Sequence, residues 1–414
     1  MTTNMTNNLG HLMRVFLPFA LGYFLSYLYR TVNAIIAPDL VRDIGLDPAS
    51  LGLLTSVYLL SFGAFQLPLG VLLDRYGPRR VEAALLLFAA AGALIFSQAT
   101  TLSGLVAGRA LIGLGVSACL MAAFKAFAIW FPMERLPLAN GVQMISGGLG
   151  ALAATTPVEA ALHVTDWRGI FLAVAVLTLL AAVVIFLVVP EKEGSRSGES
   201  LGEQMRGIGT VLSNPVFWRI SPWAITAQGA YLSIYGLWSG PWLRDVGGLD
   251  RSGIANTLFA IAVAMILGYL ISGAVADRLM RRGIAPEKVA GVGMSIFLLG
   301  QVAMLFPSPS LVLLYWLSFG FFGASCILPY AVLAQHFPTR LIGRVNTALN
   351  LMVFMAAFAA QWGIGVIINL WPETASGGYA AEGYQAGFGV MVGLQIIAIV
   401  WFMVSGKKST PPGK

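Results

Sequence analysis

The same short pattern occurs twice in this chain, each time between two long apolar runs. The first copy reads GVLLDRYGPRR and the second GAVADRLMRR, and Asp277 of the second copy follows Asp74 of the first by 203 residues. Another pair of segments keeps a similar register, because Asn140 recurs as Asn346 after 206 residues. A duplicated unit of this length predicts two similar bundles with a functional site between them, a plan typical of secondary transporters.

The composition indicates a chain that lies in lipid. Hydrophobic residues make up 57% of it and charged residues 10%, whereas soluble domains have about 45–50% and about 25%. Because backbone polar groups must be paired within lipid, and because about 20 helical residues cross a hydrocarbon core, we predict an all-α membrane protein with 12 transmembrane helices in two pseudo-symmetric six-helix bundles. The expected spans are 15–37, 51–73, 81–97, 103–128, 136–163, 167–189, 222–242, 253–276, 288–306, 311–335, 342–370 and 384–404.

One long polar segment, 191–214, mixes charges of both signs with Gly and Ser, which is typical of a linker on the membrane surface. It separates an N-terminal bundle at 1–190 from a C-terminal bundle at 215–414. Of the 25 Lys and Arg residues, 18 fall on the face shared by both termini, and basic loops favour the cytoplasm. We therefore expect a multi-pass protein of the inner membrane with both termini and the linker cytoplasmic. The net charge of +7 then reflects topology and requires no nucleic acid.

Features of a pump or an enzyme are missing from the sequence. It contains no Gly-x-x-x-x-Gly-Lys-Ser/Thr phosphate loop, and its three histidines, His11, His163 and His336, are far apart in the chain. We expect no enzymatic activity, no cofactor and no metal site. The predicted partners are the bilayer, a small-molecule substrate and a coupling ion, with H+ as the candidate, and we expect the protein to act as a monomer.

The first copy of the repeated pattern resembles the signature loop between the second and third helices of the major facilitator superfamily. Arg109 with Gly113 resembles the superfamily's fourth-helix motif, and Trp167-Arg168 resembles the start of its sixth helix. The second copy departs from the pattern, with Met280 where the first has Gly77. The resemblance covers the whole chain and implies alternating access between two six-helix halves.

The resemblance also implies that the signature loop gates access from the cytoplasmic side, because a carboxylate at a helix end can pair with a cation or face a neighbouring helix N-terminus. Asp74 and Asp277 would then set the conformational equilibrium rather than touch substrate, although plain topogenic charge is the alternative. The residues of this predicted gating motif are Gly70, Asp74, Arg75, Gly77, Arg79, Arg80, Gly273, Asp277 and Arg278.

Charges inside the apolar stretches are the candidates for substrate binding, because each costs about 2.5–3.5 kcal/mol at the bilayer centre. Arg30 and Arg109 lie well inside their spans, Lys125 lies near the cytoplasmic end of the fourth span, and Glu82 lies at a span end. No Asp or Glu is near the middle of a span, so buried cations without a central anion predict an anionic ligand. We expect Lys125 to extend to the cytoplasmic interface.

Helical periodicity extends this candidate site. At about 100° per residue, Tyr23, Tyr27 and Arg30 share one stripe of the first helix, and Gln228, Tyr231 and Tyr235 share one stripe of the seventh, its counterpart in the repeat. These residues and Arg109 are the predicted substrate-binding set. Other interpretations stay open: Arg30 and Arg109 could be structural, and the tyrosines, with Trp238 and Trp242, could face lipid.

The arginine in the first span and the segment after it resemble the organic-anion and anion:cation symporter branches of the superfamily. That resemblance implies a small organic anion as substrate. The fifth span lacks the Gly-Pro pair that marks drug/proton antiporters, which weakens the alternative of polyspecific drug or metabolite efflux by proton antiport; a non-transporting sensor is the other alternative. Glu159 and His163 are the candidates for proton coupling.

Overall fold

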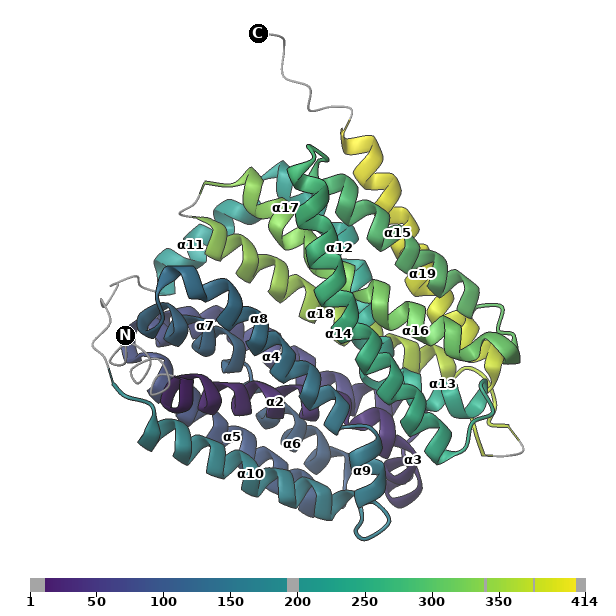
Figure 1. Ribbon diagram of the computed structural model, residues 1–414. Coiled ribbons are helices and arrows are strands. Elements are labelled where there is room, and N and C mark those ends of the chain that lie inside the picture. Colours follow the sequence, from purple (N-terminus) through teal and green to yellow (C-terminus); the bar gives the residue numbers. More distant parts are fainter. Residues whose placement is uncertain (1–11, 192–200, 339–340, 375–376, 407–414) are drawn as a thin grey trace. The chain divides into compact units, whose positions relative to one another are not determined.

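The computed structural model describes residues 12–191, 201–338, 341–374 and 377–406, and these ranges form helices with short connections and no strand (Figure 1). Two compact units divide the chain. Unit 1 comprises Met1–Leu46 and Val57–Glu203, and unit 2 comprises Asp47–Ser56 and Gln204–Lys414. The helix that contains the boundary at Ser56 is continuous, so its first residues are part of unit 2 and the remainder is part of unit 1.

Unit 1 is built around the pairs α5 with α10, α5 with α6, and α2 with α8 (Figure 1). Small residues allow the close approach: a Cβ added to Gly92 of α5 would lie 2.7 Å from the carbonyl oxygen of Gly108 on α6. The elements are η1 (Leu12–Phe16), α2 (Leu17–Thr31), α3 (Asn33–Ile44), α4 (Pro48–Tyr76), α5 (Pro78–Gln98), α6 (Leu102–Gly115), α7 (Cys119–Trp130), η2 (Met133–Arg135), α8 (Leu136–Ala153), α9 (Thr156–Ala161) and α10 (Trp167–Val188).

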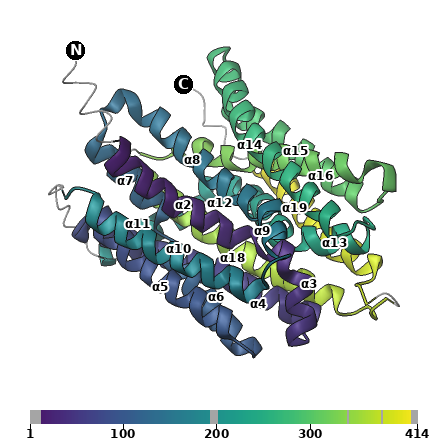
Figure 2. The same ribbon diagram turned by 60° about the horizontal axis from the view of Figure 1, so that its bottom comes forward.

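Unit 2 packs α12 against α18 and α19. It also packs α14 against α16, with α15 beside α16 (Figure 2). Its elements are α11 (Leu201–Leu212), α12 (Pro215–Ser233), η3 (Ile234–Trp238), α13 (Ser239–Asp245), α14 (Arg251–Arg281), α15 (Pro286–Met304), η4 (Pro309–Leu311), α16 (Val312–Gly323), η5 (Ala324–Ile327), α17 (Leu328–His336), α18 (Ile342–Ile368) and α19 (Ala381–Gly406). Helix α11 lies in the segment expected to be a linker.

Local sequence explains many of the helix ends. The side chain of Asp166 accepts a hydrogen bond from the Gly169 amide and starts α10, as N-cap carboxylates do. Arg168 donates to the carbonyl oxygens of Ser97 and Ala99 at the end of α5, where carbonyls lack helical partners. Between α4 and α5, Gly77 adopts a φ of +79°, which a residue with a side chain avoids. The Arg168 bonds join the start of α10 to the end of α5, and the two helices pack side by side.

Nine helical stretches in the described ranges are long and apolar enough to cross a membrane, or ten if α2 and α3 form one bent span. The two remaining expected spans are composed of shorter consecutive pieces, α8 with α9 and α12 with η3 and α13. The first span was expected at 15–37, but the helix bends by 47° between Thr31 and Asn33 and continues to Ile44. Two hydrogen bonds before the bend explain it: Arg109 of α6 donates to the Tyr29 carbonyl and Thr31 donates to the Tyr27 carbonyl, and both bonds compete with the backbone ladder.

Candidate functional site

Arg30 lies against aromatic rings of unit 1. The carbon at the centre of its guanidinium is 4.7 Å from the centroid of the Tyr27 ring and 5.0 Å from that of Phe62 on α4, and Tyr58 on α4 is its hydrogen-bonding partner. Aromatic faces attract a cation, and a planar guanidinium held in this way presents a fork of donors. Such an arrangement suits a carboxylate or sulfonate.

The two tyrosines of the predicted stripe on α2 lie together beside α8. The rings of Tyr23 and Tyr27 meet edge to face with centroids 5.1 Å apart, and the Tyr23 hydroxyl donates to the sulfur of Met144 at 3.7 Å. Gly147 of α8 makes room for both: an added Cβ would lie 2.6 Å from Tyr23 Cε1 and 2.8 Å from Tyr27 Cδ2. The structure therefore brings Tyr23, Tyr27 and Arg30 together. The missing side chain of Gly147 leaves the space that the two tyrosine rings occupy.

Arg109 occupies a different environment. Its side chain is buried, its Nη1 donates to the Tyr29 carbonyl at 2.8 Å, and the rings of Phe96, Phe171 and Tyr58 surround its guanidinium at 5.3–5.9 Å. The hydrogen bond is directed at the helix just before its bend. This position favours a role in bracing α2 against α6 over contact with a solute.

In unit 2 the predicted stripe of α12 continues into η3. Tyr231 stacks on Tyr235 with centroids 5.8 Å apart and on Phe319 of α16 at 5.5 Å. Gly323 makes the space, since a Cβ there would lie 2.4 Å from the Tyr231 ring. The amide oxygen of Gln228, one turn before Tyr231, is buried and has no hydrogen-bond partner among the described residues. Gln228 thus offers a neutral polar group for a ligand.

The idea that these aromatic stripes face lipid is wrong for the buried members. Tyr23, Tyr231 and Tyr235 are each at most 5% exposed. Trp238 is fully buried and donates from Nε1 to the Gln361 carbonyl of α18 at 2.9 Å, and Trp242 packs edge to face on Trp316. Aromatic-belt residues would expose their rings.

The first copy of the repeated motif carries an ion-pair network. Asp74 at the end of α4 pairs with Lys125 of α7, and Glu191 after α10 pairs with Arg80 at 2.5 Å and Arg79 at 3.7 Å. Lys125, expected to extend to the cytoplasmic interface, pairs with the motif aspartate at the end of α4. Gly70 and Gly77 are half-buried, and Arg75 is exposed with its guanidinium over the Tyr76 ring.

The second copy differs in its turn. Met280 replaces Gly77 and stays helical, so α14 continues to Arg281, and Gly283 makes the left-handed turn with a φ of +83°. Gly273 and Arg278 are exposed, and a Cβ on Gly273 would meet no atom within 4 Å. The side chain of Asp277 lies outside the described part of the structure.

The candidates for proton coupling form a pair at the end of unit 1 opposite to Asp74. The nitrogen Nε2 of His163 lies 3.0 Å from the Glu159 carboxylate, and 72% of the His163 side chain is exposed. Within the described ranges, no three His, Cys, Asp or Glu side chains gather as a metal site would require.

Comparison with known proteins decides the family. The model of the Major Facilitator Superfamily matches residues 19–361. The chain belongs to this superfamily. It is 25% identical to the probable sulfoacetate transporter SauU of Cupriavidus necator, over 73% of this chain and 74% of that protein. It is 24% identical to a probable L-galactonate transporter of Escherichia coli K12, over 83% of this chain and 80% of that protein.

Solved structures share this fold. A bacterial homologue of the human lysosomal transporter Spinster, in an inward-facing and occupied conformation, superimposes with a TM-score of 0.76, at 17% identity, over 95% of this chain and 96% of that one. The predicted major facilitator fold, with twelve helical segments in two bundles, is therefore confirmed, and the protein is a transporter of this superfamily rather than an enzyme.

Glu82 was expected at the end of a span and was not among the predicted substrate-binding or proton-coupling residues. Glu82 is in the second turn of α5 and is fully buried. A Cβ added to Gly22 of α2 would lie 2.2 Å from its Oε1 and 3.7 Å from the sulfur of Cys119 on α7. The glutamate therefore points into the interface of three helices, which its position in the sequence did not indicate.

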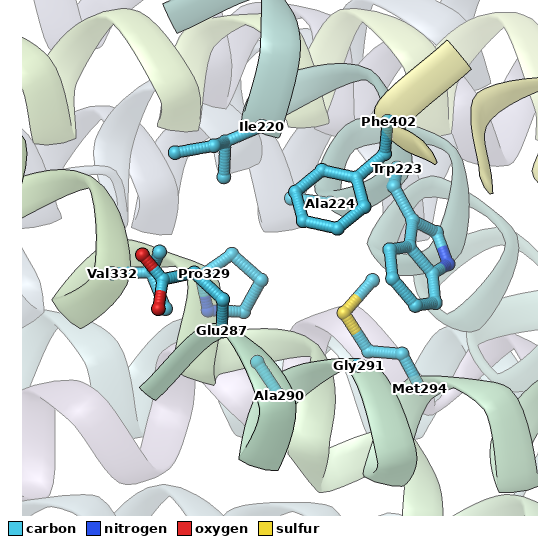
Figure 3. A pocket seen from close by; sticks show the side chains of 10 residues that line it. All are labelled: Ile220, Trp223, Ala224, Glu287, Ala290, Gly291, Met294, Pro329, Val332 and Phe402. Carbon is cyan, nitrogen blue, oxygen red and sulfur yellow. The ribbon is translucent and has the colours of Figure 1, made fainter. Parts of the chain in front are cut away.

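Unit 2 contains a small pocket (Figure 3). Glu287 and Val332 lie on one side of it, and Trp223 and Phe402 on the other. Its one charged lining residue, Glu287, pairs with His336 at 3.4 Å. The lining thus offers no cation to an anion. The lining residues are Ile220, Trp223, Ala224, Glu287, Ala290, Gly291, Met294, Pro329, Val332 and Phe402.

Proposed function

We propose that this major facilitator transporter moves a small organic anion across the inner membrane by alternating access, with Arg30 as the anchor for the charged group. The observation that carries the proposal is the Arg30 guanidinium held over Tyr27 and Phe62 beside the Tyr58 hydroxyl. Aromatic faces orient this permanent cation, and an oriented guanidinium suits recognition of a carboxylate or sulfonate.

Two further observations support an anionic solute. In unit 2, Gln228, Tyr231 and Tyr235 offer an amide and hydroxyls, neutral groups that suit the uncharged part of a hydroxylated or carboxylated solute. Two relatives are named as probable transporters of sulfoacetate and of L-galactonate, both of which are small acids. We assign Tyr23, Tyr27 and Arg30 of unit 1, with Gln228, Tyr231 and Tyr235 of unit 2, to solute binding, and Arg109 to bracing.

We also propose that the Asp74–Lys125 pair acts as part of a cytoplasmic gate, with both termini on that side, as the distribution of basic residues indicates. Both side chains are partly exposed, and an ion pair of this kind contributes about 0.2–1 kcal/mol. A contact of that size can be broken and remade during each transport cycle.

Thermal stabilisation of the purified protein tests the choice of substrate. Sulfoacetate, galactonate, neutral sugars and lipophilic cations are each added to the wild type, Arg30→Ala and Arg206→Ala. Arg206 is an exposed cation on α11, so its variant controls for the loss of one positive charge. A ligand at 100 times its dissociation constant stabilises the folded state by about 2.7 kcal/mol.

We expect at least one of the acids to raise the melting temperature of the wild type and of Arg206→Ala, and to leave Arg30→Ala unchanged. Uptake of the same acid into liposomes then measures transport. Stabilisation by cations or neutral compounds alone, equal in all three proteins, would contradict the proposal and make Arg30 a structural residue.

A further inference from the structure

We propose that Glu82 is the site at which this transporter binds a coupling proton. The inference rests on the proposed function, because it assigns a second ligand, H+, to the cycle that moves the anion. It differs from the expectation that Glu159 and His163 carry the proton, since that pair lies at a solvent-exposed end of unit 1.

The position of Glu82 is unusual for an acid. The residue is in α5, its side chain is fully buried, and both carboxylate oxygens are out of solvent contact. Neither oxygen accepts a hydrogen bond from an N–H or O–H donor of the described residues; the polar group that faces them is the thiol of Cys119, a weak donor. Among the described residues, a carboxylate in this place has no cation beside it and only a weak thiol donor.

Energetics then favour the neutral acid in this arrangement. An ionised carboxylate that is moved into an apolar interior without a partner costs several kcal/mol, so such a group holds a proton instead. A buried ionisable residue in a membrane helix is for this reason a candidate functional group. Helices α2, α5 and α7, which enclose Glu82, are also the helices that carry Arg30, the motif loop and Lys125, so a change of charge at Glu82 acts on the elements that bind and gate.

The charged groups on the surrounding helices are engaged with other partners or distant. On α7, Lys125 pairs with Asp74. On α6, Arg109 donates to the Tyr29 carbonyl, and on α10, Arg168 donates to carbonyls at the far end of α5. Helix α2 presents Gly22 to Glu82, and Arg30, two turns further along α2, interacts electrostatically with Cys119.

The proposed proton cycle has two steps, binding and release. A water-borne proton binds one carboxylate oxygen of Glu82 when the helix interface opens to one side of the membrane, and the O–H bond breaks to return the proton to water on the other side. Each protonation and deprotonation of Glu82 thus moves one proton across the membrane. Co-transport with a singly charged anion would be electroneutral.

Infrared difference spectroscopy of the purified protein tests proton binding without any solute. Spectra of the wild type, Glu82→Gln and Glu287→Gln are recorded between about pH 5 and about pH 9, the range that spans ordinary and strongly buried glutamates. Glu287 is the matched control, because it is a partly exposed glutamate at the start of α15 that pairs with His336.

We expect the C=O band of a protonated carboxyl group at about pH 7 in the wild type and in Glu287→Gln, its loss at higher pH, and its absence from Glu82→Gln. Identical spectra of the wild type and Glu82→Gln, or a band that does not change with pH, would overturn the proposal. If the glutamine variant does not fold, Glu82→Asp replaces it, and a band that titrates as in the wild type would count against Glu82.

Liposomes provide the second readout, with sulfoacetate as the probe. Glu82→Gln is expected to keep exchange of internal for external sulfoacetate and to lose accumulation driven by a pH gradient. Two results would overturn the coupling role of Glu82. One is accumulation at the wild-type level, and the other is the loss of both exchange and accumulation. If the wild type transports no organic anion, the proposed function fails, while the infrared result still decides whether Glu82 binds a proton.

Discussion

Gly147 is the residue on which the positions of Tyr23 and Tyr27 depend. A methyl group there would lie 2.6 Å and 2.8 Å from the two rings, closer than carbon atoms can approach without movement of a neighbour. We predict that Gly147→Ala displaces the tyrosines and raises the KM for the transported anion about tenfold, equivalent to about 1.4 kcal/mol. Gly141→Ala on the same helix, where the added Cβ meets no atom within 4 Å, is the control in the same uptake assay. Equal KM values for the two variants would contradict this prediction.

Arg109 provides a second prediction at this scale. Arg109→Met removes the hydrogen bond to the Tyr29 carbonyl and leaves a buried acceptor unpaired, which costs about 1–3 kcal/mol. We expect a lower melting temperature without ligand and, in the molecules that remain folded, nearly unchanged stabilisation by the anion. The reverse pattern, normal stability with no response to the anion, would show that Arg109 binds the solute.

Among the elements, α4 and α7 are joined by the Asp74–Lys125 pair. We predict that Asp74→Asn lowers the transport rate about fivefold, corresponding to about 1 kcal/mol in the balance between closed and open forms, and spares stabilisation by the anion. The exchanged double variant, Asp74→Lys with Lys125→Asp, is expected to recover part of the rate. Loss of rate and of anion binding together in Asp74→Asn would refute the gating role.

At the scale of the whole molecule, α4 contributes to both units. Its first residues pack in unit 2 against α18: a Cβ on Gly365 would lie 2.3 Å from the Pro48 carbonyl oxygen, and Gln361 donates to the Thr55 hydroxyl at 2.8 Å. Trp238 donates to the Gln361 carbonyl at the same place. These contacts hold residues 47–56 in unit 2.

Substitution at Gly365 tests this arrangement. Gly365→Leu overpacks the contact with Pro48, at a cost of about 1–3 kcal/mol, and should increase the reaction of Thr55→Cys with a water-soluble maleimide in a protein whose Cys119 and Cys326 are replaced by Ala. Gly363→Leu, at a position where a Cβ meets no atom within 4 Å, is the control. Unchanged labelling in Gly365→Leu would mean that this contact does not hold α4 in unit 2.

The sequence by itself predicted a helical membrane fold with a duplicated motif, because hydrophobic length and a repeat offset are properties of the chain alone. The resemblance of the first motif copy indicated the superfamily, which the family model confirmed. The sequence also put Tyr23, Tyr27 and Arg30 on one face of a helix, since periodicity is local. Periodicity does not say which neighbour a face meets, so only the tertiary structure paired Lys125 with Asp74, directed Arg109 at a backbone carbonyl, bent the first span after Thr31 and enclosed Glu82 among three helices. Each of these depends on contacts between helices far apart in sequence, and packing at close range decides such contacts.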